Sequence, residues 1–262
     1  MRLGHAVVLG VLIAGACHAA PKAQQPCKDS ACADISEVAQ PMVLTASDGV
    51  KVHGLLFEAR QPKALILLFH QAGSSKDEYR TIAPQLVAAG YSALAIDQRS
   101  GGGMYGTNET AKAVGRDVPY REARPDLQAA LDWAQSRKLP IVLWGSSYSS
   151  ALIFPLAADD PQGIVALLAF SPGDYFDGKP PVSAAAAKLN IPVFIASTNA
   201  KAETDEANPV FAALRKSSAN VRFVPEHAVH GSSMLNASRN PKGAEANMRV
   251  VLDFLDRVAP AK

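Results

Sequence analysis

A serine within a run of small residues is the first group in the sequence that could do chemistry. The segment Gly145-Ser146-Ser147-Tyr148-Ser149 follows residues 141–144, whose continuous hydrophobicity is typical of a strand buried on both faces. It fits the pattern G-x-S-x-G, except for serine at the last position. In this pattern a strained strand-to-helix turn presents a nucleophilic hydroxyl between two small residues. Gly145 and Ser149 are those small residues, so the pattern predicts Ser147 as a nucleophile.

Two other interpretations apply to the same serines. A frame shifted to Ser146 would place the bulky Trp144 and Tyr148 at the two positions that must be small. A serine-rich helix N-cap after a strand, with no catalytic role, is common and would also explain these residues. The rest of the chain must decide between the nucleophile and the cap.

Composition sets the scale of the protein. The chain has 262 residues, of which 48% are hydrophobic and 19% are charged. This is enough for one full hydrophobic core and suits a single large α/β domain. The formal net charge is +2 and no long basic run occurs, so we expect no nucleic-acid partner.

The first residues have the pattern of an export signal. Arg2 is followed by the apolar residues 6–16, and Ala19-Ala20 supplies small residues for cleavage. The apolar run is shorter than the roughly 20 residues of a membrane-spanning helix. We therefore predict a signal peptide over residues 1–20 and a periplasmic or secreted protein.

Cys17 offers a second route of processing. Ala14-Gly15-Ala16-Cys17 resembles a bacterial lipoprotein box, with alanine where an aliphatic residue is usual. We favour plain cleavage after Ala19 or Ala20, so that a membrane partner is expected only if Cys17 carries lipid.

Residues 21–40 are polar and without periodicity, and we interpret them as a leader before the domain of residues 41–262. Cys27 and Cys32 form an even pair that predicts a small disulfide-closed loop in an oxidising compartment. A metal site is the alternative, but no histidine or further cysteine lies nearby to complete four ligands.

Strands alternate with helices along the domain. The apolar runs that predict about eight strands are residues 41–45, 50–57, 64–69, 91–96, 141–144, 164–170, 191–196 and 221–224. Helical spacing of apolar residues marks segments at 79–87, 127–134, 148–158 and 248–255, and Asn208 with Pro209 predicts the start of a further helix. Pro84 is expected to kink or divide the first helix, and residues 100–119 are expected to form a Gly-rich loop.

This alternation predicts an α/β fold with a mostly parallel sheet and helices on both faces. Asp48-Gly49 predicts a hairpin that places an antiparallel pair at the sheet edge. Ligands bind at the carboxyl ends of the strands in such sheets. His70, Asp97, Ser147 and the segments after Ala196 and Val224 should therefore gather at one edge.

Over roughly residues 42–258 the chain resembles the α/β-hydrolase family, and within it the compact dienelactone-hydrolase-like serine esterases. The resemblance implies the order nucleophile, acid, histidine. No long insertion separates Ser147 from the segment that carries the acid, so we expect no large cap domain. It implies that His230, followed by Gly231 after the last strand, is the histidine. His227 is the alternative, but it lies only three residues beyond Val224 and is expected to finish the strand.

The carboxylate comes from residues 197–206, which contain Glu203, Asp205 and Glu206. Ala200-Lys201-Ala202-Glu203 resembles a form found in some small hydrolases in which the glutamate is the acid. The resemblance implies Glu203, with Asp205 as the alternative. A solvated charge run that caps a helix at Pro209 would explain the same residues without catalysis.

An oxyanion hole needs two backbone N–H donors. The resemblance implies Tyr148, directly after the nucleophile, and Gln71, since His70-Gln71 stands where many relatives have His-Gly. We expect Met104 and Tyr105 to line the site. For Asp97-Gln98-Arg99 we expect a structural role.

The sequence as a whole predicts an exported serine hydrolase, a carboxylesterase that cleaves a small ester through an acyl-enzyme without metal or organic cofactor. Dienelactone hydrolases proper use cysteine where this chain has Ser147, so their lactone substrate is not carried over. The alternative is a non-catalytic binding or envelope-tethered protein on the same fold. No residue pattern predicts an oligomeric state.

Overall fold

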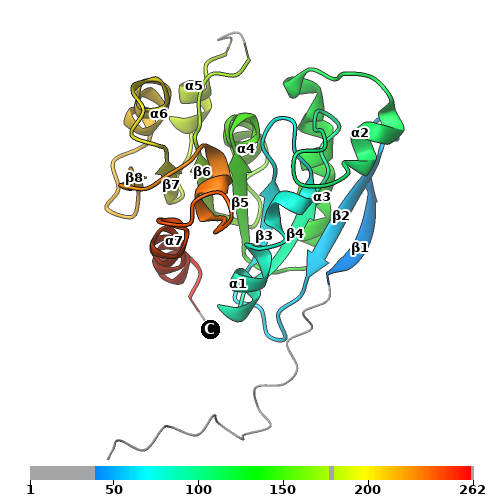
Figure 1. Ribbon diagram of the computed structural model, residues 1–262, viewed down its shortest axis with the longest axis horizontal. Coiled ribbons are helices and arrows are strands. Elements are labelled where there is room, and N and C mark those ends of the chain that lie inside the picture. Colours follow the sequence, from blue (N-terminus) through cyan, green and yellow to red (C-terminus); the bar gives the residue numbers. More distant parts are fainter. Residues whose placement is uncertain (1–38, 177–179, 261–262) are drawn as a thin grey trace, which may run out of the picture. The chain divides into compact units, whose positions relative to one another are not determined.

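One eight-stranded sheet organises the described part of the chain. The computed structural model describes residues 39–176 and 180–260. Its strand order is β1-β2-β4-β3-β5-β6-β7-β8, from the blue edge to the orange edge in Figure 1. The strands are β1 (Gln40–Thr45), β2 (Lys51–Phe57), β3 (Leu65–Phe69), β4 (Ser92–Ile96), β5 (Ile141–Ser146), β6 (Ile164–Phe170), β7 (Val193–Ala196) and β8 (Val221–Phe223). The predicted strands are confirmed.

The predicted signal peptide and most of the leader, with Cys17, Cys27 and Cys32, lie outside the described residues. Within the described ranges, no helix is long and apolar enough to cross a membrane.

Strand direction divides the sheet into two parts. β2 pairs antiparallel with both β1 and β4, and the hairpin between β1 and β2 turns at Gly49 with φ 86°, as Asp48-Gly49 predicts. The remaining pairs, from β4 through β8, are parallel. All residues of β3, β4 and β5 are buried, which explains their continuous apolar runs. The carboxyl ends of six parallel strands therefore meet at one edge.

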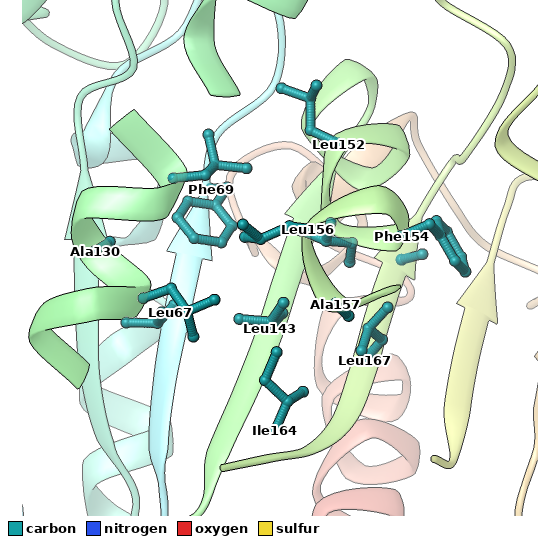
Figure 2. Close-up of a cluster of buried hydrophobic side chains, with 14 of the residues drawn as sticks. Leu67, Phe69, Ala130, Leu143, Leu152, Phe154, Leu156, Ala157, Ile164 and Leu167 are labelled. Atoms are coloured by element: carbon teal, nitrogen blue, oxygen red, sulfur yellow. The ribbon is translucent and has the colours of Figure 1, made fainter. Parts of the chain in front are cut away.

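Alternate residues of these strands enter two separate cores. Leu67, Phe69 and Leu143 face the core that also holds Ala130 of α3 (Arg124–Ser136) and Leu156 of α4 (Tyr148–Asp159), and Figure 2 shows this cluster. Ile66 and Leu68 face the opposite core, which includes side chains of α1 (Ala83–Ala88) and α7 (Ala244–Val258). Helices therefore cover both faces of the sheet, as the alternation predicts.

The helices are α1 (Ala83–Ala88), α2 (Glu109–Val114), α3 (Arg124–Ser136), α4 (Tyr148–Asp159), α5 (Val182–Ala186), α6 (Lys201–Ala213) and α7 (Ala244–Val258), with the 3₁₀ helices η1 (Lys76–Tyr79), η2 (Tyr120–Ala123) and η3 (Gly231–Leu235). The segment with Pro84 consists of two short pieces, η1 and α1, rather than one kinked helix. Pro84 lies in the first turn of α1, where its missing N–H costs nothing.

The predicted start of a helix at Asn208 and Pro209 is wrong. Helix α6 begins at Lys201 and keeps Pro209 inside it. The ring of an internal proline removes one helical hydrogen bond, and here the helix runs through that position. Residues 201–206 are therefore the first turns of a helix rather than a loop, and Glu203 lies in its first turn.

The predicted loop over residues 100–119 contains a helix. The Asn108 side chain accepts a hydrogen bond from Ala111 N (2.7 Å) at the start of α2, and Gly115, with φ 69°, ends it. The sequence contains both the Asn108 cap and Gly115, but the glycines at 101–103 and 106 favoured a loop over the whole segment. Helix α5 was also not predicted.

The segment after β4 anchors the loops at the functional edge of the sheet. Arg99 Nη2 lies 2.7 Å from the buried Asp126 Oδ1, and Arg99 also pairs with Asp48. Lys76 Nζ lies 2.9 Å from the buried Asp97 Oδ2. These ion pairs agree with the structural role predicted for Asp97-Gln98-Arg99.

Asp126→Ala should lower the free energy of unfolding by about 3 kcal/mol, because it leaves the buried Arg99 without one of its two carboxylate partners. Urea denaturation measures the change. Glu122→Ala is the matched control, since it breaks an exposed pair with Arg116 (3.2 Å) and should cost less than about 1 kcal/mol. Equal effects of the two substitutions would contradict the anchoring role.

Candidate active site

Ser147 occupies a strained turn between β5 and α4. Its φ of 58° and ψ of −124° are rare for a residue with a side chain, and such strain persists only where neighbouring contacts hold it. Ser147 N donates to Phe170 O (2.8 Å). A Cβ atom at Gly145 would lie 2.4 Å from the Cα of Ser150, so only glycine fits there. The turn has the geometry that the motif predicts.

Ser149 stands where the motif usually has glycine, and its hydroxyl is fully used. Ser149 Oγ accepts from Ser146 N (2.9 Å) and donates to Phe69 O (2.7 Å). The side chain is fully buried. The serine therefore fits because it supplies partners to one backbone group of the turn and to one at the end of β3.

His230 connects two of the predicted residues. Its Nε2 lies 2.8 Å from Ser147 Oγ, and its Nδ1 lies 2.9 Å from Glu203 Oε1. The carboxylate can only accept, so Nδ1 carries the proton and Nε2 is free to accept the serine proton. His227, the alternative, is instead an exposed side chain whose Nε2 lies 3.9 Å from Glu226 Oε1.

Glu203 is held in its ionised form. Its Oε2 accepts hydrogen bonds from Ser171 Oγ (2.7 Å) and Thr198 N (2.9 Å). Burial alone would raise its pKa, but the hydrogen bonds from His230, Thr198 and Ser171 outweigh burial and lower the pKa to about 2. A carboxylate in this state orients the imidazole at neutral pH.

The other two acidic residues of the segment point elsewhere. Asp205 pairs with Lys201 on the exposed side of α6. Glu206 accepts a hydrogen bond from Asp174 N (3.0 Å). Of the three predicted candidates, the structure brings Glu203 to His230.

Gln71 cannot serve as first predicted in the oxyanion hole, because its N–H donates to Glu78 Oε2 (2.9 Å). Its carbonyl is also engaged. His70 Nε2 accepts from Gln98 N (2.9 Å), so His70 Nδ1 carries the proton and donates to Gln71 O (2.8 Å). Burial lowers the pKa of His70 to about 4, which keeps the ring neutral.

The next residue offers a free donor. In a trans peptide the N–H points opposite to the carbonyl, so the N–H of Ala72 points away from the His70 ring that holds Gln71 O. In the parallel pair of β3 and β5, Phe69 lies opposite Gly145. Ala72 comes three residues after Phe69, and Tyr148 comes three residues after Gly145, so both N–H groups follow the same edge of the sheet. Within the described residues, neither N–H has a hydrogen-bond partner. Ala72 replaces Gln71 as the candidate donor beside Tyr148.

Met104 and Tyr105 lie beside the loops that carry the site. Met104 N donates to Gly73 O (2.9 Å), and the Met104 side chain is half exposed. The Tyr105 hydroxyl lies 2.5 Å from Ser233 Oγ in the loop after His230. Neither residue is among those that line the adjoining pocket, so their contact with substrate stays a prediction.

An open pocket of about 690 Å³ adjoins the loop after β3. It is lined by Gly73 of that loop, by residues 99–101 after β4, by Ala111 of α2, and by residues 115–118 and Tyr120. Tyr120 stacks on the Tyr148 ring with 4.4 Å between centroids, which links the pocket to the first residue of α4.

The family model described as serine aminopeptidase, S33, matches residues 60–223. The chain belongs to this family of α/β hydrolases. The matched residues span β3 to β8 and include Ser147 and Glu203. No curated protein sequence matches this hydrolase.

Solved structures show the same fold in other α/β hydrolases. A dienelactone hydrolase from Anabaena variabilis superposes with a TM-score of 0.67 at 17% identity, covering 85% of this chain and 98% of its own. The Pyrococcus furiosus esterase Pf2001 gives 0.66 at 19% identity, with 86% and 94% covered. A carboxyl esterase from Bacillus coagulans gives 0.66 at 13% identity, with 84% and 98% covered. The expected α/β-hydrolase fold is confirmed.

Several contacts of the site in this hydrolase were not predicted from sequence. Ser171 Oγ accepts from Gly231 N (2.9 Å) while it donates to Glu203, so it joins the acid to the histidine segment. The Tyr175 hydroxyl donates to Ser171 O (2.9 Å). Ser171 directly follows β6, and a polar residue at the carboxyl end of a parallel strand is an indication in the sequence that it lies at the site. Nothing in the sequence around Glu78 indicates that it contacts the site through Gln71 and Ser146.

Proposed function

We propose that this α/β hydrolase is a serine carboxylesterase that cleaves small esters through an acyl-enzyme intermediate. The observation that carries the proposal is the hydrogen-bonded chain from Ser147 Oγ through His230 to Glu203. Nucleophile, base and orienting carboxylate are within hydrogen-bonding reach in the order that acyl transfer requires. The fold relatives include a dienelactone hydrolase and carboxyl esterases, which supports an ester substrate.

Acylation begins when His230 Nε2 removes the proton of Ser147 and Oγ attacks the ester carbonyl carbon. Glu203 stabilises the imidazolium that results. The negative charge that develops on the carbonyl oxygen is stabilised by the N–H groups of Tyr148 and Ala72. The tetrahedral intermediate then expels the alcohol, which takes the proton from His230, and the acyl group remains on Ser147.

Deacylation repeats these steps with water as the nucleophile. His230 removes a proton from water, the hydroxide attacks the acyl carbon, and the second intermediate expels Ser147 Oγ. His230 returns the proton to Ser147, and the carboxylic acid leaves.

The family description also raises aminopeptidase activity. An aminopeptidase must bind the ammonium group of its substrate, which calls for an available carboxylate near the nucleophile. The carboxylate that lies beside His230, Glu203, already accepts hydrogen bonds from His230, Ser171 and Thr198. Glu203 is therefore not available to bind an ammonium group, and a comparison of ester and aminoacyl substrates decides between the two activities.

Ser147→Ala should reduce hydrolysis of p-nitrophenyl esters by at least about 10⁴-fold with the fold unchanged, because it removes the nucleophile. The assay uses esters of several chain lengths beside aminoacyl p-nitroanilides. Labelling by a fluorophosphonate probe tests the serine directly. Folded wild-type protein that neither turns over esters nor takes the label would favour a non-catalytic binding protein, and turnover of the anilides alone would favour the aminopeptidase.

Glu203→Gln should lower kcat by about 10⁴-fold, because an amide favours the wrong tautomer of His230. Asp205→Asn is the matched control on the same helix and should change kcat less than about twofold, since Asp205 pairs with Lys201 at the surface. A larger loss for Asp205→Asn than for Glu203→Gln would reverse the assignment.

We further propose that the hydrolase is exported, which rests on the charged start, the apolar core and the small residues of residues 1–20. Expression of the full chain in a bacterium, followed by cell fractionation and mass spectrometry, should recover protein that begins after Ala19 or Ala20 outside the cytoplasm. Diacylglycerol on Cys17 would establish tethering instead. An intact Met1 in the cytoplasm would contradict export.

A further inference from the structure

Glu78 is a buried carboxylate for which the proposed reaction has no use. It lies in η1, and its side chain is almost fully buried. No ion pair to Glu78 occurs within residues 39–176 and 180–260. A carboxylate in this setting is costly unless hydrogen bonds replace its lost hydration. Its hydrogen bonds therefore call for a physical explanation.

Both carboxylate oxygens bind loops of the active site. Oε2 accepts from Gln71 N (2.9 Å), in the loop after β3 that precedes the candidate oxyanion donor Ala72. Oε1 accepts from Ser146 Oγ (2.8 Å), the residue directly before the nucleophile. Glu78 therefore joins the loop after β3 (residues 70–75, the oxyanion loop) to the turn that carries Ser147.

Ser146 extends this connection to the histidine. Its Oγ accepts from Ser232 N (2.9 Å), two residues after His230. A Cβ atom at Gly231 would lie 2.6 Å from Ser146 Oγ, so the segment of residues 230–233 approaches as closely as glycine allows. Gln71 Nε2 donates a hydrogen bond to Ser233 Oγ (2.9 Å), which connects the oxyanion loop directly to the segment of residues 230–233. Three loops that are distant in sequence thus meet at the Glu78–Ser146 pair.

We propose that Glu78 is a positioning residue that, in its ionised form, holds the oxyanion loop and the histidine segment at a fixed distance from Ser147. The inference rests on the proposed esterase function. Glu78 fixes the N–H of Gln71 while His70 fixes its carbonyl, and together they set the direction of the Ala72 N–H. A donor displaced from the developing oxyanion loses much of its effect on the transition state and little of its effect on substrate binding.

The ionised form is needed because both oxygens must accept. A protonated carboxyl carries one O–H, which can no longer accept from Ser146. Burial raises the pKa of Glu78 to about 7 against the opposing hydrogen bonds of Gln71, Ser146 and Ser74. The titratable groups that interact with it are Tyr79 on its own turn and Tyr148 on α4. Glu78 therefore gains its proton as pH falls through neutrality.

Glu78→Gln should lower kcat for a p-nitrophenyl ester by about 10-fold to 100-fold, with KM changed less than about twofold. The amide imitates the protonated carboxyl, so the ratio of wild-type to variant kcat should be large at about pH 8.5 and approach one at about pH 5.5. Glu58→Gln, at an exposed pair with Arg137, is the matched control and should leave kcat unchanged.

Ser146→Ala breaks the same connection from its other end. Combined with Glu78→Gln, it should lower kcat by less than the product of the two single losses, because both variants remove one connection. Should Glu78→Gln fail to fold, Ser146→Ala alone carries the test through its kcat and KM.

Wild-type kcat in Glu78→Gln, or equal changes in kcat and in KM, would overturn the positioning role, as would a ratio independent of pH. Absence of both ester turnover and fluorophosphonate labelling in the wild type would instead overturn the proposed function, so the two failures are distinct.

Discussion

The strained backbone of Ser147 is the constraint on which the site depends. A positive φ at a residue with a side chain costs of order 1–3 kcal/mol, and surrounding contacts must supply that energy. Here Ser149 binds the backbone of the turn, and Gly145 allows the close approach of α4 to β5. The turn directly follows β5, which pairs with β3 on one side and β6 on the other. The contacts that hold the strained residue therefore come from the centre of the sheet.

Two glutamates, Glu203 half-buried and Glu78 buried, show how environment separates like groups. Glu203 accepts three hydrogen bonds, one of them from an imidazole that becomes charged during the reaction, and its pKa falls to about 2. Glu78 has only uncharged donors and deeper burial, and its pKa rises to about 7. One carboxylate is thus permanently charged, whereas the other titrates near neutrality.

Sequence patterns predicted the parts of the molecule that depend on local rules. Buried parallel strands give continuous apolar runs, and the small residues around Ser147 follow from the turn itself, so both were found. The predicted start of α6 was wrong because it relied on Pro209, which is common in the first turn of a helix. In the folded protein the helix begins at Lys201 and continues through Pro209. The donor from the oxyanion loop shifted from Gln71 to Ala72 because the partner of Gln71 N, Glu78, is set by tertiary structure. Glu78 itself could not be predicted, since its partners come from separate loops.

The attachment of α2 has a consequence for which substitutions the site can tolerate. Lys76 and Asp97 anchor the start of α2 through Glu109, while Ser147, His230 and Glu203 come from the opposite half of the sheet. Ala111 of α2 and residues 115–118 after it line the pocket. Substitutions at these positions can therefore change the shape and charge of the pocket without altering a contact between Ser147, His230 and Glu203. The segment that shapes the pocket and the side chains proposed to do the chemistry belong to separate halves of the fold.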